Sequence, residues 1–499
     1  MDLEGAGHQA IDKICDYLQT LEEGKLVPDV KPGFLREALP DNTPEDGEKF
    51  DDIAEDFERL ILPGILNWQH PMFFAWFPTA GTYESMLGDL YSSSVSNPGF
   101  NWSCSPACTE LEAVVMDWSA KLFHLDDVFF NSSRIGGGVM QTTASDSALV
   151  AVIAARAKYQ RRHPEVPLEK LLIYFTTATH ALGVKTGLIL GLKCRALQVT
   201  AKNNYALQGE EVSAALEEDR AAGFHPFVLI ATIGTTYTGA VDRIDEIGPI
   251  TRNNGLWLHI DAAWAGVALA CPEYHEACYL NGINTYADSF CTNFHKWGLV
   301  NFDASTLWVR DRSLLTEALD CSPAYLRSKQ SDEGTVVDYR NWQLPLGRRF
   351  RSVKVWFVLR SYGIEGFRSY LRKGITLAKQ FQILVRSDPR FEIVTPPFLA
   401  LTVFRIRPPS DIQTDRSDAD INNTMLNALN RIFHRRLSAK DLFLTSIDLD
   451  GIFCIRLAIG SQRTEERHIK KVWDILDSEV EPAVNEWLGS NWGSNTLAD

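Results

Sequence analysis

The stretch from about residue 105 to 310 alternates between helical patterns and short apolar runs, and this alternation restricts the fold more than any other feature. The apolar runs are Leu171–Thr176, Phe227–Ile233, Leu256–Asp261 and Ser305–Val309, and the helical patterns cover 109–123, 143–160, 180–191, 209–222 and 242–254. Continuous apolar runs bounded by Gly, Asn or Asp are typical of strands buried on both faces. Helices interleaved with such strands predict an α/β domain with a mostly parallel sheet.

Four segments are expected along the chain. They are a helical arm over residues 1–85, an α/β domain over 86–365, a smaller α+β domain over 366–485 and a tail over 486–499. In the arm, Ile11, Ile14 and Leu18 are spaced to lie on one helix face, and a second helix is expected to begin at Thr43 and Pro44. Because such an arm has little to bury alone, we expect it to pack on the body of the protein or on a second subunit, and an ordinary pair of surface helices fits the pattern equally well.

Composition excludes several classes of protein. The 49 Lys and Arg against 64 Asp and Glu give a formal charge of −15, which argues against a chain that coats nucleic acid or an anionic membrane. The nine cysteines are scattered without a CxxC pair, so neither a disulfide framework nor a zinc site is predicted. Neither an apolar stretch of about 18 residues nor a signal-like N-terminus occurs, so we expect a cytoplasmic protein with reduced thiols.

Lys296 lies in an unusual setting for a lysine, between aromatic residues in the sequence NFHKW (293–297). Partial desolvation there would lower the pKa of its amine and make it nucleophilic, as a lysine that bonds to a carbonyl requires. A buried lysine paired with an acid, or one that reaches out to solvent, fits the same pattern. On the local sequence alone these structural roles are favoured.

Asp261 ends an apolar strand and is followed by small residues, including Ala263. The carboxyl ends of parallel strands line the ligand crevice, and a buried carboxylate there needs a cationic partner. A protonated pyridine nitrogen is one such partner, and Ala263 would let a flat ring lie close. A helix N-cap explains the aspartate equally well.

Two more features are expected at the same sheet edge. The run GGGVMQTTAS (136–145) opens a helix, and its glycines, hydroxyls and free N–H groups predict a phosphate cradle, although ordinary turn chemistry gives the same pattern. His180 follows a strand directly and is a candidate for stacking on a ring, although a lone histidine is more often structural. In this order, with Lys296 35 residues after Asp261, the four features match the requirements of a pyridoxal phosphate enzyme.

From about residue 5 to 485 the chain resembles the aromatic L-amino acid decarboxylases, of the group II pyridoxal phosphate-dependent decarboxylases. The matching motifs are HPMFFAWFPTA (70–80), SPACTELE (105–112), HIDAAWAG (259–266), NFHKWGLVNFDAS (293–305) and DYRNWQLPLGRRFRS (338–352). The resemblance implies a fold type I enzyme with pyridoxal 5′-phosphate as cofactor. It also implies a homodimer with the active site at the subunit interface, which would explain the arm.

Roles at the cofactor follow from the resemblance. The lysine of the HKW motif, here Lys296, holds the cofactor covalently, and Asp261 pairs with its pyridinium nitrogen. Ala263 packs under the ring and His180 stacks above it. Other positions that match contacts to the cofactor or its phosphate are Ala144, Ser145, Thr236, Asn293 and His295.

The resemblance also assigns the substrate pocket. Thr79 and His180 match substrate-contact positions, and the matching lining residues are Trp68, Trp76, Phe77, Pro98 and Phe100. Gly347 matches a position where, in plant relatives, Gly accompanies indole substrates and Ser accompanies phenols. Tryptophan-type substrates are therefore favoured, with tyrosine, DOPA, 5-hydroxytryptophan and phenylalanine as alternatives.

Tyr325 matches the loop tyrosine that returns a proton to Cα after CO₂ leaves, whereas relatives with Phe there produce aldehydes. Its presence favours decarboxylation to an arylalkylamine over the alternative, an aromatic aldehyde synthase. A cofactor-binding homologue without activity is a further alternative that the intact catalytic residues disfavour. The chain departs from the family at Ala181 and Phe294, which affects the expected substrate but removes no catalytic group.

Overall fold

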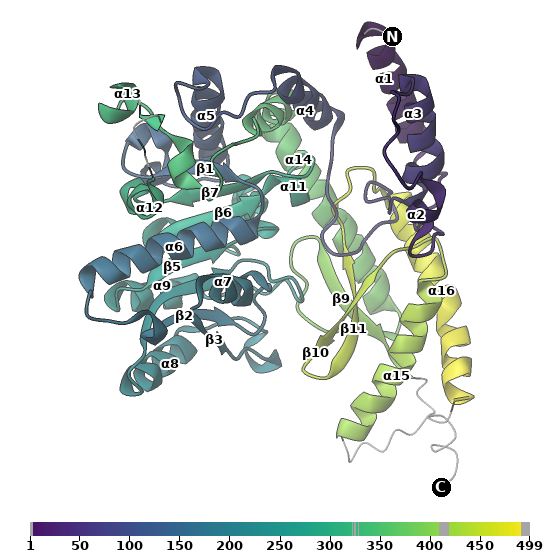
Figure 1. The fold of residues 1–499 in the computed structure, drawn as a ribbon. Coiled ribbons are helices and arrows are strands. Elements are labelled where there is room, and N and C mark those ends of the chain that lie inside the picture. Colours follow the sequence, from purple (N-terminus) through teal and green to yellow (C-terminus); the bar gives the residue numbers. More distant parts are fainter. Residues whose placement is uncertain (1–2, 322, 324–325, 328, 409–418, 491–499) are drawn as a thin grey trace.

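The computed structural model of the chain describes residues 3–321, 323, 326–327, 329–408 and 419–490 and is built around two β-sheets (Figure 1). The larger sheet has seven strands in the order β1-β7-β6-β5-β4-β2-β3. These strands are β1 (Gly137–Gln141), β2 (Leu171–Thr176), β3 (Lys193–Leu197), β4 (His225–Thr232), β5 (Trp257–Asp261), β6 (Ser289–Asn293) and β7 (Ser305–Val309). Strands β2 to β6 run parallel, and only β7 is antiparallel to its neighbours β1 and β6. The predicted α/β fold with a mostly parallel sheet is confirmed.

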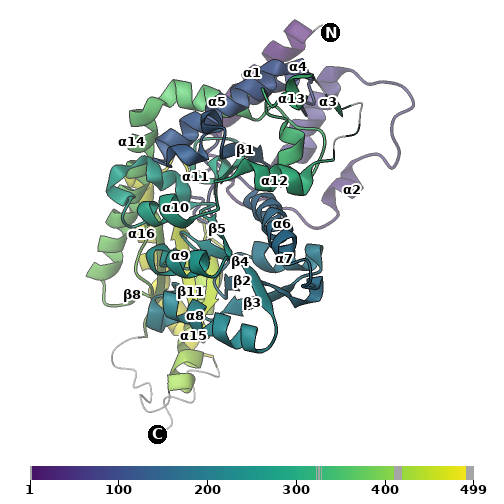
Figure 2. The ribbon, with the colours of Figure 1, turned by 90° about the vertical axis from the view of Figure 1, so that its left-hand side faces the viewer.

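Helices cover both faces of this sheet (Figures 1 and 2). The helices in this part of the chain include α5 (Pro106–Leu122), α6 (Ala144–Arg162), α7 (Leu182–Leu190), α8 (Gly209–Ala221), α9 (Ile244–Asn253), α10 (Leu280–Tyr286), α11 (Phe294–Trp297), α12 (Arg312–Leu319) and α13 (Lys329–Asp332). Successive strand residues enter different apolar clusters: Ile173 and Val228 pack with α6, whereas Tyr174 and Leu229 pack with α8 and α9. Burial on both faces explains why a central strand such as β2 is almost entirely apolar.

The smaller sheet is antiparallel and has the order β10-β11-β9-β8. Its elements are β8 (Phe391–Ile393), β9 (Leu401–Ile406), β10 (Thr445–Leu449), β11 (Ile452–Ala458), α15 (Ala419–Leu437) and α16 (Glu466–Leu488). Helix α14 (Ser352–Ser387) connects the two sheets and breaks at Gly363, whose φ of 61° is strained for other residues. The α+β character expected after residue 366 is therefore present.

The first three helices of the arm bury no residue within one chain. Its helices are α1 (Leu3–Thr20), α2 (Phe34–Ala38) and α3 (Phe50–Asp56), and α4 (Tyr83–Val95) follows. No residue of α1 or α3 is buried, and Phe50, Ile53 and Phe57 are 45%, 51% and 47% exposed. The expected helix start at Thr43 is wrong: residues 43–49 form no helix, because Gly47 disfavours it.

Among the described residues, no helix combines the length and the apolar character needed to cross a membrane.

Candidate active site

A cavity of about 200 Å³ lies at the carboxyl edge of the large sheet. Three neighbouring parallel strands each end there in a polar residue: Thr232 on β4, Asp261 on β5 and Asn293 on β6. The full lining is Phe77, Thr143, Ala144, Ser145, His180, Leu182, Thr232, Gly234, Thr236, Asp261, Ala263, Trp264, Asn293, His295 and Lys296. The structure thus brings together every residue that the sequence assigned to the cofactor.

The start of α6 forms one wall of the cavity. Thr143 caps the helix, since its Oγ1 accepts a hydrogen bond from the Asp146 backbone N–H at 3.4 Å. Ala144 and Ser145 are the first helical residues, so their N–H groups have no partner within the helix. Gly137 and Gly138, in contrast, belong to the buried strand β1. Of the residues predicted to form a phosphate cradle, Thr143, Ala144 and Ser145 line the cavity, and the glycines do not.

Asp261 is held at one of its two oxygens. Oδ1 accepts a hydrogen bond from the Ala263 backbone N–H at 3.0 Å and from the Cys291 thiol at 3.9 Å. The carboxylate is 3% exposed, and the short helix that follows begins only at Ala265, with Trp264 as its N-cap. The helix-cap explanation for this aspartate is therefore wrong.

Lys296 is partly buried beside an aromatic wall. Its Nζ lies 5.5 Å from the centre of the Phe77 ring, which stacks on Trp264 with ring centres 4.4 Å apart. Burial lowers the pKa of the amine, and the charge of Asp261 opposes that effect. Within the described part of the chain no ion pair includes Lys296, so the structure favours an amine available for chemistry over a structural pair.

Two histidines present the same ring nitrogen for donation. His180 Nδ1 accepts the Leu182 N–H at 3.2 Å, and His295 Nδ1 accepts the Ala304 N–H at 2.8 Å. Burial lowers the pKa of His180, and it lowers that of His295 to about 3. A neutral ring whose Nδ1 accepts carries its proton on Nε2, so both rings act as Nε2–H donors.

The deciding observation is a comparison with protein families. Residues 32–407 match the model described as the pyridoxal-dependent decarboxylase conserved domain. The chain belongs to the pyridoxal-dependent decarboxylases. It is therefore a carboxy-lyase, and the predicted family, enzyme class and cofactor are confirmed.

Relatives of this decarboxylase match along nearly their whole length. Tyrosine decarboxylase 2 of Narcissus pseudonarcissus is 43% identical over 98% of this chain and 96% of its own. Phenylacetaldehyde synthase of Arabidopsis thaliana is 44% identical over 95% of each chain. The crystal structure of Oryza sativa TDC with PLP and tryptamine has a TM-score of 0.92 and 33% identity, covering 97% of this chain and 98% of that one.

The cavity of the decarboxylase fits pyridoxal phosphate. Thr232 Oγ1 and Asn293 Oδ1 are buried and have no hydrogen-bond partner in the described protein, as expected where a polar ligand binds. The wall also offers the N–H groups at the start of α6, a carboxylate and a partly buried amine. Phosphate, pyridine nitrogen and aldehyde each find a chemically matching group.

The predicted substrate residues of the decarboxylase are more scattered. Phe77 and His180 line the cavity, and the Oγ1 of Thr79 accepts a hydrogen bond from Gln69 at 3.2 Å. Trp68 stacks on Trp76 with ring centres 5.1 Å apart, outside the cavity lining.

Three substrate residues of the decarboxylase lie in another place. Pro98 and Gly347 line a separate pocket of about 450 Å³, and the Phe100 carbonyl accepts the Arg340 N–H. One chain alone therefore does not assemble the predicted substrate pocket. Tyr325 falls outside the described residues.

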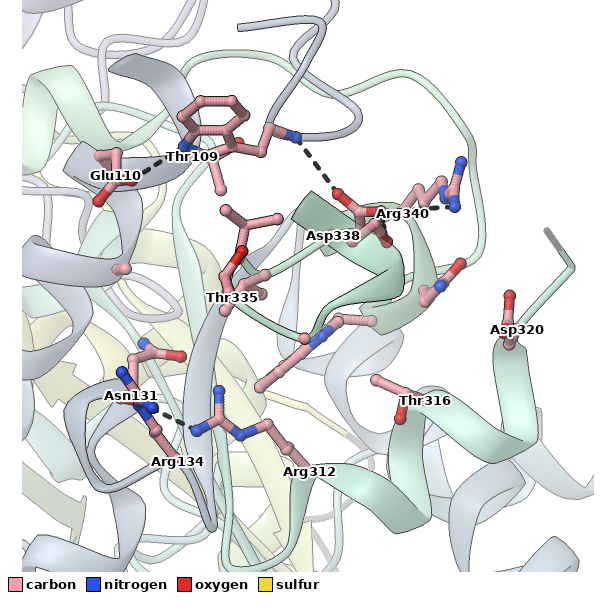
Figure 3. Close-up of a pocket in the computed structure, with 18 of the residues that line it drawn as sticks. Thr109, Glu110, Asn131, Arg134, Arg312, Thr316, Asp320, Thr335, Asp338 and Arg340 are labelled. Carbon is pink, nitrogen blue, oxygen red and sulfur yellow. Dashed lines mark hydrogen bonds and ion pairs between the residues drawn. The ribbon is translucent and has the colours of Figure 1, made fainter. Parts of the chain in front are cut away.

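A larger cavity of about 760 Å³ lies elsewhere, between α5, α12 and the segment before α14 (Figure 3). Arg312 donates to the Asn131 carbonyl at 3.1 Å, and the Trp102 indole donates to Glu110 at 2.9 Å. Neither a lysine nor the end of a parallel strand lines this cavity. Although it is the larger of the two, we therefore do not assign it as the catalytic cavity.

Sequence reasoning missed several residues at the site. Thr232 ends a strand as Asp261 does, and this pattern would have identified it. The sequence around Trp264 and Arg456 has no such pattern. The Arg456 guanidinium lies 5.1 Å from the Phe77 ring centre, and burial lowers the pKa of Arg456 to about 10. Arg456 comes from β11 in the small sheet, so only the tertiary fold brings it to Phe77.

Proposed function

We propose that this decarboxylase converts an aromatic L-amino acid to the arylalkylamine and CO₂, with Lys296, Asp261 and His180 acting on pyridoxal phosphate. The observation that carries the proposal is the single cavity that combines a desolvated amine, a strand-end carboxylate and the free N–H groups of α6. When bound, the cofactor supplies an electron-accepting ring for the electron pair that CO₂ leaves behind.

Each group of the chain has a defined task in this proposal. The N–H groups of Ala144 and Ser145 bind the phosphate, and the Lys296 amine holds the cofactor covalently. Asp261 keeps a proton on the ring nitrogen through its carboxylate, which makes the ring a stronger electron acceptor. The neutral His180 ring stacks on the cofactor and offers Nε2–H to the substrate.

The aromatic wall favours loss of a charged carboxylate. Phe77 and Trp264 exclude water from one side of the cavity, and an apolar environment destabilises a carboxylate more than neutral CO₂. The Tyr325 hydroxyl returns a proton to the substrate Cα. Loss of CO₂ followed by protonation at that carbon yields the amine.

Tryptophan-type substrates are the preferred class in this proposal. The support is the absence of a side chain at Gly347, together with the aromatic ring of Phe77 in the cavity wall. The likeness to Oryza sativa TDC with tryptamine supports the same choice.

A homodimer with the active site at the subunit interface completes the proposal. Pro98, Phe100 and Gly347 do not line the Lys296 cavity in one chain, so a second copy is needed to supply them. The exposed apolar face of the arm, with Phe50, Ile53 and Phe57, supplies a surface for that copy. We also propose a cytoplasmic location, which the nine unpaired cysteines support.

An aromatic aldehyde synthase is the second candidate, because one relative with 44% identity is a phenylacetaldehyde synthase. One experiment separates the two. The enzyme loaded with pyridoxal phosphate is given tryptophan, 5-hydroxytryptophan, tyrosine, DOPA and phenylalanine in competition, and amines, aldehydes, ammonia and peroxide are quantified. We expect an arylalkylamine as main product, with tryptophan or 5-hydroxytryptophan consumed fastest. Aldehyde with ammonia and peroxide would reject the decarboxylase proposal.

A further inference from the structure

Four buried side chains form a continuous hydrogen-bonded series behind Asp261. The Trp257 indole N–H donates to Ser289 Oγ at 2.8 Å, and Ser289 Oγ lies 2.8 Å from His259 Nδ1. His259 Nε2 lies 3.7 Å from Cys291 Sγ, which donates to Asp261 Oδ1 at 3.9 Å. All four side chains are at most 1% exposed, and none of them lines the cavity.

The pleat of two paired strands places these groups together. Trp257, His259 and Asp261 alternate along β5, so their side chains share one face. Ser289 and Cys291 alternate along the adjacent β6, where Ser289 pairs with His259 and Cys291 with Asp261. The series therefore follows directly from the sequence pattern of the two strands.

The direction of proton donation along the series is fixed by its ends. An ionised carboxylate only accepts, so the single thiol proton of Cys291 points to Asp261. Sγ then accepts from His259 Nε2–H, which leaves Nδ1 of the same ring as an acceptor for the Ser289 hydroxyl. Ser289 Oγ accepts from the Trp257 indole, which is a donor only. Each of the four side chains thus donates a hydrogen bond to the next group in the direction of Asp261.

The intermediate groups carry no charge. Burial lowers the pKa of His259 to about 3. Burial, reinforced by the nearby Asp261 carboxylate, raises the pKa of the Cys291 thiol well above its ordinary value. The series therefore delivers one hydrogen-bond donor to Asp261 without adding a buried charge.

We propose that Cys291 and His259 are positioning residues that orient the Asp261 carboxylate and stabilise its ionised form. The Cys291 thiol and the Ala263 N–H both donate to Oδ1, and no hydrogen bond of the described residues reaches Oδ2. Oδ2 thus remains free for the protonated ring nitrogen of the cofactor. This inference rests on the proposed role of Asp261 at the cofactor.

A double-mutant cycle on cofactor affinity tests the inference. The dissociation constant of pyridoxal phosphate is measured by equilibrium dialysis for the unaltered protein, Cys291→Ala, Asp261→Asn and the double variant. Because the thiol acts through the carboxylate, Cys291→Ala should weaken binding roughly tenfold but change affinity less than about twofold in the Asp261→Asn background. Cys291→Ser keeps a donor and should retain most of the affinity.

The outcomes of the cycle separate two failures. An equal loss of affinity from Cys291→Ala in both backgrounds would overturn the positioning role, because the effect would not pass through Asp261. Unchanged affinity in Asp261→Asn would instead overturn the proposed role of Asp261 itself. Thermal unfolding of each cofactor-free variant establishes that the protein is folded.

A second measurement observes the ring directly. The ring nitrogens of His259 are observed by ¹⁵N NMR in the enzyme loaded with pyridoxal phosphate, and the signals that disappear in His259→Gln identify them. The series requires a neutral ring with its proton on Nε2. A proton on Nδ1, or on both nitrogens, would overturn the direction of donation and with it the inference.

Discussion

The amine of Lys296 and the ring of Phe77 lie against each other, with Nζ 5.5 Å from the ring centre. Phe77 in turn stacks on Trp264 with an interplanar angle of 17°. The amine therefore faces aromatic surface where most lysines face water, and burial lowers its pKa. A lysine in this setting has a larger neutral, nucleophilic fraction near neutral pH.

Replacing Phe77 by Leu should weaken recognition of aromatic substrates. The change keeps the wall apolar but removes the ring, and an aromatic pair contributes about 0.5–1.5 kcal/mol beyond its buried area. We expect KM for the preferred amino acid to rise roughly two- to tenfold. Steady-state kinetics measure it, with Phe224→Leu as control, because Phe224 precedes β4 at the opposite sheet edge. An unchanged KM would show that Phe77 does not contact the substrate.

Tyr325→Phe should shift the products from amine toward aldehyde. Without the phenolic proton, the substrate carbon that loses CO₂ would be protonated more slowly, and oxidation there by O₂ would give the aldehyde with ammonia and peroxide. Product analysis by chromatography, together with peroxide detection, measures the shift. Tyr339→Phe is the matched control, because the buried Tyr339 hydroxyl has no hydrogen-bond partner in the described protein. An unchanged amine yield in Tyr325→Phe would mean that another group protonates Cα.

Gly347→Ser should alter substrate preference without altering stability. A Cβ built on Gly347 meets no atom within 4 Å, so the fold accepts the side chain. We expect the ratio of kcat/KM for tryptophan to that for tyrosine to fall roughly tenfold, at an unchanged melting temperature. Gly47→Ser, also in open space, is the control. Equal ratios in the two variants would exclude Gly347 from selecting the substrate.

His295 should make the cofactor-free protein less stable in acid. Its pKa is lowered from 6.5 to about 3 by burial, so between these values the unfolded chain binds a proton that the folded protein does not. The contribution of this group is fully present above pH 6.5 and declines as the pH falls toward 3, at up to about 1.4 kcal/mol per pH unit. Urea unfolding across this range measures the slope, which should be smaller in His295→Gln. The same dependence of unfolding free energy on pH in both proteins would contradict the lowered pKa of His295.

The central strands, Asp261 and Lys296 were predictable because the local hydrophobic pattern of the sequence agrees with the overall fold at these residues. Leu171–Thr176 and Ser305–Val309 are continuous apolar runs, and the structure places β2 and β7 at those residues. Asp261 ends one parallel strand and Lys296 follows the next, and the carboxyl ends of such strands meet at one edge. The fold type and the position of Asp261 and Lys296 at one sheet edge therefore follow from sequence.

Other features depend on contacts that a local pattern does not contain. Strand β3 has exposed and polar residues, such as Lys193, and β1 begins with glycines, so neither resembles a buried strand. Arg456 reaches Phe77 from a different sheet. Pro98 and Gly347 line a pocket separate from the Lys296 cavity, and no local pattern indicates that separation.

Reduction of the loaded enzyme with borohydride, followed by peptide mass spectrometry, tests the central claim most directly. The account predicts that the reduced cofactor remains covalently attached to the peptide containing Lys296, and that Lys296→Ala abolishes this attachment while the protein stays folded. Attachment to a different lysine, or persistent attachment in Lys296→Ala, would contradict the account.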